Sequence, residues 1–157
     1  MNPGTVFGVY YIGSRLFRLR DKYLEMALST IAQFGIVAIG GAVGAMSRFG
    51  VQHIPLFGDD KYYYTVVINV SGCFIMGVLW ALFSHFGTSR GWELLILTGF
   101  LGGYTTYSAF TLDGMELINK GQFWLMGYYI AMTIVFGLGG CALGLFGTDR
   151  ILKYLGY

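Results

Sequence analysis

The sequence predicts an all-α integral membrane protein with four transmembrane helices. Of its 157 residues, 55% are hydrophobic and 11% are charged, whereas a soluble domain carries about 25% charged residues. The mean hydropathy is +0.62. Four apolar stretches follow one another at residues 31–49, 64–86, 94–117 and 123–146, each near the roughly 20 residues that cross a bilayer. The short links between them leave no room for a second domain.

Residues 1–28 precede the first span and carry a net charge of +2, from four basic and two acidic side chains. Their apolar run is too short to cross a membrane, and no small-residue cleavage site stands out, so we do not expect a signal peptide. We predict a basic N-terminal extension. Three alternatives stay open for it: an amphipathic surface segment, a disordered tail, or residues upstream of a natural start near Met26. Residues 29–157 form the predicted four-helix membrane domain.

The charged side chains lie outside the middle of the four runs. They gather at residues 59–61, 90–93, 113–120 and 149–153, which we take to mark the loops. Without residues 1–28, each side of the membrane receives three basic residues: Arg90, Arg150 and Lys153 on one side, Arg48, Lys61 and Lys120 on the other. Such a balance permits insertion in both orientations and hence an antiparallel homodimer, whereas the four basic residues of the extension favour a single orientation.

Glycines recur at four-residue spacing in the first, third and fourth spans, and predict close helix packing: Gly40 with Gly44, Gly99 with Gly103, and Gly140 with Gly144. In the second span, Asn69 is the amide well inside the apolar run, so it needs a polar partner. Asn69 either makes a structural hydrogen bond to another helix or has a role in function. Cys73 and Cys141 have no metal-site spacing and are expected to be packing residues.

The third span contains two adjacent glycines, Gly102 and Gly103, followed by a run of hydroxyl side chains. Glycine disfavours a regular helix, so we predict a break near mid-membrane whose carbonyls face protein, a wet cavity or an ion site. The alternative is a continuous helix whose hydroxyls bond back to their own turn. In the fourth span, Tyr129 and Thr133 are four residues apart and share one helical face.

Three segments, in this order, resemble motifs of the Fluc (CrcB) family of fluoride channels. Residues 40–48, GGAVGAMSR, resemble the family's GGxxGAxxR, and residues 67–74, VINVSGCF, resemble its VNxxGxF motif. Residues 99–110, GFLGGYTTYSAF, resemble GFxGGxTTFSTF, which is the most specific of the three. The resemblance covers about residues 35–147 and leaves only the two ends outside.

In that family, two small subunits assemble antiparallel and form two fluoride pores around a central sodium ion. The resemblance implies that main-chain carbonyls of Gly102 and Thr105, from both subunits, hold sodium as a structural cofactor at the dimer interface. It also implies that Tyr107 and Phe110 stand at the positions of paired pore phenylalanines, and that Arg48 lies near a vestibule. The implied fluoride pathway comprises Asn69, Thr106, Tyr107, Phe110, Tyr129, Thr133 and Arg48.

Three positions depart from the family pattern. Tyr107 replaces a phenylalanine and adds a hydroxyl that either donates to fluoride or narrows the passage. Ala109 replaces a threonine, and Thr133 stands where serine is commoner. These changes leave the implied polar track chemically similar.

The resemblance implies a fluoride-selective channel of the plasma (inner) membrane that exports cytoplasmic fluoride by passive electrodiffusion. Its expected partners are fluoride, sodium, lipid and a second subunit, either a second copy or a paralogue. An enzyme is not expected, because the chain has no carboxylate pair or Ser/His/Asp arrangement in its spans, and a net charge of +2 gives nucleic-acid binding little support.

Two alternatives remain. A small proton-coupled exporter needs a titratable group in the membrane, yet the first two spans lack Asp and Glu, and Asp113 and Glu116 lie toward an end of the third. A non-conducting assembly subunit would use Asn69 and the glycines for packing alone.

Overall fold

The computed structural model describes residues 29–55, 57–58 and 60–156, so the predictions made for residues 1–28 lie outside the described residues. The chain divides into two compact units, Met1–Gly35 and Ile36–Tyr157. Of the first unit, the described residues 29–35 are helical. The second unit holds every residue of the predicted site.

Within the described residues, all regular structure is helical. Three helices are long and apolar enough to cross a membrane: Ser29–Gln52, α2 (Lys61–Phe86) and α6 (Phe123–Tyr154). Shorter helices connect α2 to α6: α3 (Arg90–Trp92), the π-helix η1 (Glu93–Leu101), α4 (Gly102–Tyr104) and α5 (Tyr107–Asn119). The chain is therefore an all-helical, multi-pass membrane protein, and the third predicted span corresponds to this series of shorter helices.

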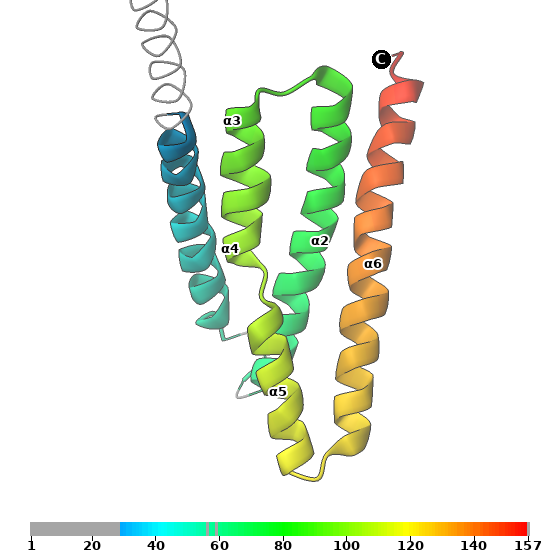
Figure 1. The fold of residues 1–157 in the computed structure, drawn as a ribbon. Helices are drawn as coiled ribbons and strands as arrows, with labels where there is room; N and C mark the ends of the chain where they lie inside the picture. The colour runs from blue at the N-terminus through cyan, green and yellow to red at the C-terminus, as the bar shows by residue number, and fades with distance from the viewer. Residues whose placement is uncertain (1–28, 56, 59, 157) are drawn as a thin grey trace, which may run out of the picture. The chain divides into compact units, whose positions relative to one another are not determined.

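The helices α2 and α6 run side by side in the same direction, and the series from α3 to α5 runs the opposite way (Figure 1). Glycine lets the two long helices approach closely. A Cβ added at Gly77 would overlap the Cys141 carbonyl oxygen, and one added at Gly144 would overlap the Phe74 carbonyl oxygen and lie 2.9 Å from the Val78 nitrogen. Such contact between backbones supplies the dispersion energy that holds helices together in lipid.

A second glycine contact joins residues 36–52 of the first long helix to η1 and α4. Added Cβ atoms at Gly40 and Gly44 would overlap the carbonyl oxygens of Leu95 and Phe100, and one at Gly103 would overlap the Gly41 carbonyl oxygen. The prediction that the glycine pairs pack against other helices is confirmed. It also explains why position 103 is a glycine, since a side chain there would prevent the close approach.

The backbone is extended between α4 and α5. Thr105 has φ −76° and ψ 158°, and Thr106 has φ −149° and ψ 117°, whereas Gly102 and Gly103 are helical. The interruption therefore follows the glycine pair that the sequence pattern identifies. The hydroxyls of Thr105 and Thr106, rather than the glycines, lie at the point where the helix stops.

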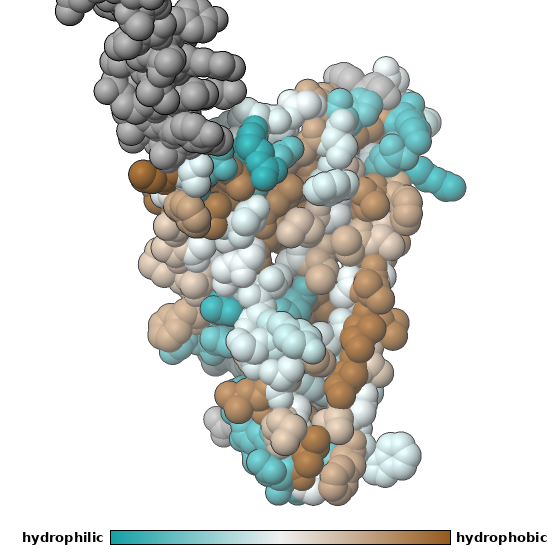
Figure 2. Space-filling model, viewed as in Figure 1, coloured by the Kyte–Doolittle hydropathy of each residue, from teal (hydrophilic) through white to brown (hydrophobic). Residues whose placement is uncertain are grey.

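The long helices expose wide apolar faces. In the 18-residue apolar stretch of each of these three helices, only 11% to 22% is buried. Figure 2 shows hydrophobic residues over the middle of one face, along α6, with hydrophilic residues gathered toward the two ends. Exposed apolar area of this extent requires lipid or another protein against it.

The structure corrects the expectation that the charged groups mark the loops. Residues 149–153 lie within α6, and residues 90–93 lie in α3 and at the start of η1. The charges at residues 113–120 do not mark a loop either, because α5 continues to Asn119 and buries the Asp113 side chain within the bundle. The buried carboxylate is tolerated there because hydroxyl donors from α2 and α6 satisfy it. The turn itself is confined to residues 120–122.

Candidate functional site

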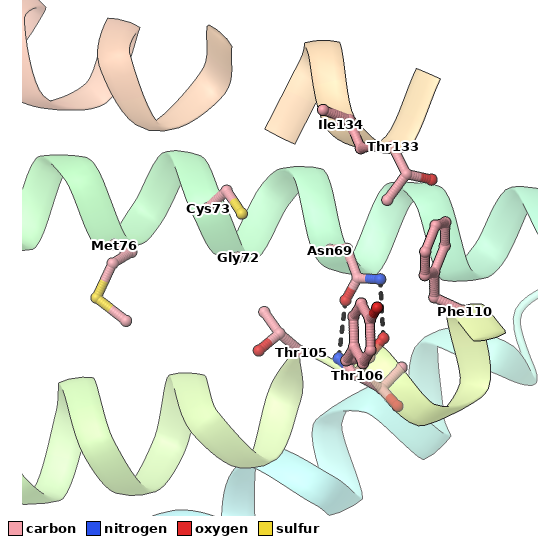
Figure 3. Close-up of a pocket in the computed structure, with 10 residues that line it drawn as sticks. Asn69, Gly72, Cys73, Met76, Thr105, Thr106, Phe110, Thr133 and Ile134 are labelled. Carbon is pink, nitrogen blue, oxygen red and sulfur yellow. Dashed lines mark hydrogen bonds between the residues drawn. The ribbon is translucent and has the colours of Figure 1, made fainter. Parts of the chain in front are cut away.

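A cavity of about 310 Å³ lies between α2, α6 and the extended residues that separate α4 from α5 (Figure 3). Most of the residues that the sequence singles out for a pathway line it. Its walls are Asn69, Gly72, Cys73, Met76, Thr105, Thr106, Tyr107, Phe110, Thr133 and Ile134. The cavity is thus mainly apolar, with an amide, hydroxyls and an aromatic ring converging on it.

Asn69 binds the main chain where the helix is interrupted. Its Nδ2 donates to the Thr106 carbonyl oxygen at 3.0 Å, and the Thr106 N–H donates to Asn69 Oδ1 at 2.8 Å. A carboxamide has the donor and acceptor of a peptide group, so its oxygen replaces the helical acceptor that the Thr106 N–H lacks. One N–H of the Asn69 amide is left over after this exchange.

The carbonyls of residues 102–105 lose their helical donors at this point, and those of Gly102 and Thr105 are two of the four. In an uninterrupted helix, the Gly102 oxygen would accept from the Thr106 N–H, and the Thr105 oxygen from the Ala109 N–H. Instead Thr106 donates to Asn69, and the Ala109 N–H donates to the Thr106 hydroxyl at 3.2 Å. Both carbonyls are therefore released from the regular ladder.

These carbonyls lie in different surroundings. Gly102 is exposed, and a Cβ added there would meet no atom within 4 Å. The Thr105 oxygen accepts a hydrogen bond from Arg48 Nη1 at 3.4 Å. The Thr105 hydroxyl donates to the Leu101 oxygen at 2.9 Å, so the side chain caps its own helix.

Arg48 lines a second cavity, of about 450 Å³, on the other side of the interruption. Thr106 lines both cavities, and Ser108 adds a hydroxyl 3.4 Å from that of Thr106. The first turn of α5 also faces this space, and helix N-termini favour anions. A positive side chain, two hydroxyls and a helix N-terminus therefore gather here.

Tyr129 lies outside the first cavity but next to its wall, with its ring centroid 5.2 Å from that of Phe110. Its hydroxyl donates to Asp113 Oδ2 at 3.2 Å. Thr133 lines the cavity while its hydroxyl donates to the Tyr129 carbonyl oxygen at 2.8 Å. Tyr107 is 78% exposed, so its ring stands at the edge of the cavity rather than inside it.

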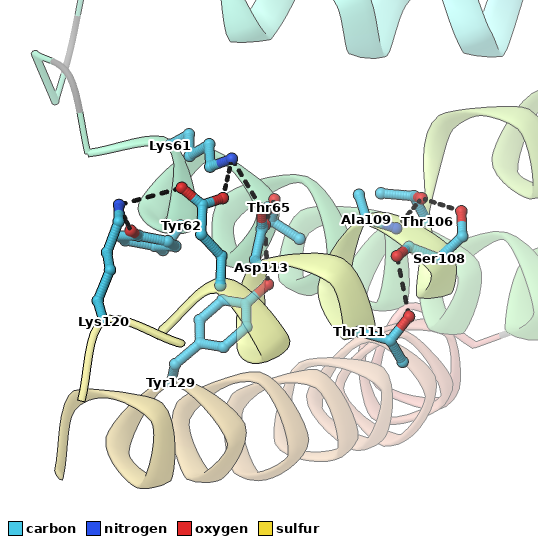
Figure 4. A network of polar contacts seen from close by, with 11 residues as sticks. Lys61, Tyr62, Thr65, Thr106, Ser108, Ala109, Thr111, Asp113, Lys120 and Tyr129 are labelled. Carbon is cyan, nitrogen blue, oxygen red and sulfur yellow. Dashed lines mark hydrogen bonds and ion pairs between the residues drawn. The ribbon is translucent and has the colours of Figure 1, made fainter. Parts of the chain in front are cut away.

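The sequence did not single out the polar cluster that surrounds Asp113 (Figure 4). The Asp113 side chain accepts from the Thr65 hydroxyl at 2.7 Å as well as from Tyr129, and Lys61 Nζ lies 3.9 Å from its Oδ1. Lys61 also pairs with Glu116. The signal that could have found this cluster is a carboxylate inside an apolar run of residues 94–117, because such groups are usually functional.

These features define a class of protein: a multi-pass helical membrane protein whose apolar helices surround a cavity with a few directed polar groups. Residues 35–145 match the family described as CrcB-like protein, Camphor Resistance (CrcB). The chain belongs to this family. The resemblance found in its motifs is thereby confirmed.

Relatives of known name agree with this result. The Fluoride-specific ion channel FluC of Rhizobium etli (strain CIAT 652) is 39% identical over 113 residues, which cover 70% of this chain and 90% of the relative. The protein of the same name from Vibrio parahaemolyticus serotype O3:K6 (strain RIMD 2210633) is 39% identical over 113 residues, covering 70% and 89%. Ion channels are not enzymes, so membership of this family confirms the expectation that the chain is not an enzyme.

Proposed function

We propose that this chain forms a fluoride-selective channel that carries cytoplasmic fluoride out of the cell by passive electrodiffusion. The observation that carries the proposal is the convergence of Asn69, Thr106, Phe110 and Thr133 on one cavity beside the interrupted helix. Membership of a family whose named relatives are fluoride-specific channels supports the choice of ion.

The chemistry of the cavity suits a small, strongly hydrated anion. Fluoride sheds water only where donors replace it, and the remaining N–H of Asn69 is such a donor. The edge of the Phe110 ring carries a weak positive charge that faces an anion favourably. Because the remaining walls are apolar, these contacts are few, and few contacts allow the ion to leave again.

We place Arg48 at the entrance. Arg48 lines the second cavity, and Thr106 lines both cavities. A positive group there raises the local concentration of anions. Tyr107, Tyr129 and Thr133 complete the proposed fluoride pathway, with Tyr129 bordering the cavity through Phe110.

We further propose that α3, η1, α4 and α5 together make a fourth transmembrane segment, interrupted near mid-membrane at Thr105 and Thr106. The extended backbone at these residues and the reversal of chain direction between α2 and α6 support this. The proposed domain comprises residues 29–157 in the plasma (inner) membrane, and two copies assemble antiparallel.

We propose sodium as a structural ion at the carbonyls of Gly102 and Thr105, the second of which also accepts from Arg48 Nη1. Hard oxygen ligands suit such a cation, and two carbonyls of one chain are too few for it, so a second copy must supply the rest. Gly102 is exposed and open enough for a second copy to approach. When bound, sodium would hold two subunits together and add a positive charge between their pores.

Efflux from liposomes tests the function. Purified protein is reconstituted into vesicles loaded with fluoride or chloride, and release is followed with ion-selective electrodes. We expect fluoride to leave rapidly while chloride leaves at the rate of protein-free vesicles. Equal leak of both ions, or no fluoride efflux from assembled protein, would contradict the proposal.

A further inference from the structure

A buried carboxylate lies on the far side of Tyr129 from the cavity. The Asp113 residue is 5% exposed, and its Oδ2 accepts hydrogen bonds from Thr65 and Tyr129. Both donors are themselves buried, at 2% and 3% exposure. Asp113 therefore accepts both hydrogen bonds from side chains that are enclosed by the bundle.

A continuous series of contacts joins this carboxylate to the cavity. The Phe110 ring lines the cavity and packs against Tyr129, whose hydroxyl reaches Asp113. The proposed fluoride pathway includes Phe110 and Tyr129, so an ion that follows it approaches the negative charge of the Asp113 carboxylate. In a medium of low dielectric constant such a charge opposes an anion strongly.

The structure also holds the compensating charge. Lys61 Nζ lies 3.9 Å from Asp113 Oδ1, on the side of the carboxylate that the two hydroxyls leave open (Figure 4). Lys61 extends from the first residue of α2, and its side chain is 53% exposed, so it faces both the carboxylate and solvent.

Two further charged groups face the same space. Glu116 on α5 pairs with Lys61 and, at 3.0 Å, with Lys120 Nζ, which also donates to the Tyr62 hydroxyl at 3.0 Å. The two lysines and two carboxylates of this cluster therefore carry no net charge together. The two lysines are the more exposed members, while Asp113 is the buried one.

We propose that Lys61 is the counter-charge that allows fluoride to pass the Asp113 carboxylate, so that this lysine sets the rate at one mouth of the pathway. The inference rests on the proposed fluoride conduction. It adds a positioning residue that acts through Asp113, since Lys61 need not touch the ion itself.

A double-mutant cycle on fluoride efflux tests the inference. The variants are K61Q, D113N and K61Q/D113N, reconstituted at equal density after size-exclusion chromatography shows equal assembly. K61Q should lower fluoride efflux about tenfold, a moderate value because the lysine is half exposed to screening solvent. In the D113N background the same lysine substitution should change efflux by less than about twofold.

Two further variants provide the controls. K61R keeps the charge and should stay within about twofold of wild type. K153Q removes a lysine from a more exposed pair away from the cluster, in which Lys153 Nζ lies 2.6 Å from Asp149 Oδ2, and should leave efflux unchanged.

The possible outcomes are distinct. Equal loss from K61Q in both backgrounds, or no loss in either, would overturn the role of Lys61 while leaving fluoride conduction intact. Absence of fluoride efflux from the wild-type protein would instead overturn the proposed function.

Discussion

The side-chain amide of Asn69 and the main chain of Thr106 exchange two hydrogen bonds, of 3.0 Å and 2.8 Å. This pair joins α2 to the extended residues between α4 and α5. An unpaired peptide group inside a membrane is costly, so the pairing is what makes the interruption tolerable at this place. The same exchange takes the Thr106 N–H away from the Gly102 carbonyl.

Replacement of Asn69 by alanine should therefore lower fluoride efflux at least tenfold. Such a change corresponds to a lost interaction of about 1.4 kcal/mol or more. The substitution removes a donor from the cavity wall and leaves the Thr106 peptide group without its partner. Efflux from liposomes at matched protein density measures the effect.

Gln33→Ala is the matched control, because Gln33 carries the same amide on an exposed part of the first long helix. It should leave efflux unchanged. If N69A assembles normally and conducts like the wild type, Asn69 serves neither the pathway nor the interruption.

Removal of sodium should destabilise the assembled protein. A ligand that binds the folded state alone stabilises it by about 2.7 kcal/mol when its concentration is ~100-fold above its Kd. Thermal unfolding is compared in sodium chloride and in N-methylglucamine chloride at equal ionic strength, and the Tm should be higher in sodium.

Thr105→Val is informative in the same experiment. The Thr105 hydroxyl bonds to the Leu101 oxygen, whereas the proposed sodium ligand is the main-chain carbonyl. The variant should thus keep the sodium-dependent rise in Tm. An equal Tm in sodium chloride and in N-methylglucamine chloride would show that ionic strength, and not a sodium site, stabilises the protein.

Much of the candidate site could be predicted from the sequence, because its motifs are local. Asn69, Thr106, Phe110 and Thr133 come from three separate spans and still line one cavity. These residues were implied by the resemblance to the family's motifs. The glycine spacing predicted, from residue type alone, that these spans pack closely against other helices.

The interruption was predicted around residues 102–106, but its position within that segment could not be predicted. Glycine has low helix propensity, which made Gly102 and Gly103 the weakest helix formers of the segment. The structure keeps both in α4 and places the break at Thr105 and Thr106, where a side chain from α2 satisfies the peptide. The hydrogen bond from a residue of α2 determined at which of the neighbouring residues the helix stops. A partner from another helix cannot be identified from the sequence of the third span alone.

The cluster at Asp113 could not be predicted for the same reason, because its hydrogen-bond partners come from other helices. Its carboxylate looked like part of a loop because Glu116 and Lys120 follow it closely. Its actual donors, Thr65 and Tyr129, are distant in the sequence. A cluster built from three helices becomes recognisable only when those helices are placed together.

Tyr107→Phe should leave fluoride efflux within about twofold of wild type, because an exposed hydroxyl contributes little to binding inside a cavity. Tyr107 is 78% exposed, and its ring lies 5.8 Å from the Phe110 ring. The comparison variant is Phe110→Ala, which removes an aromatic wall and should reduce efflux. A loss with Y107F equal to that with F110A would show that the tyrosine hydroxyl itself contacts the ion.

Gly77→Ala should destabilise the α2 and α6 pair by about 1–3 kcal/mol, because overpacking forces the backbones apart. The added methyl would overlap the Cys141 carbonyl oxygen. Gly127→Ala is the control, since nothing lies within 4 Å of an added Cβ there. Thermal unfolding in detergent should show a lowered Tm for the first variant alone, and equal Tm values would contradict the packing argument.

The reversal potential of the current across a planar bilayer tests conduction of fluoride most directly. With unequal fluoride on the two sides and equal chloride and pH, we expect the current to reverse at the fluoride equilibrium potential. We expect the same value when a pH gradient is imposed. A reversal potential that follows chloride, or that moves with the pH gradient, would contradict a passive fluoride channel and favour an unselective pore or a proton-coupled exporter.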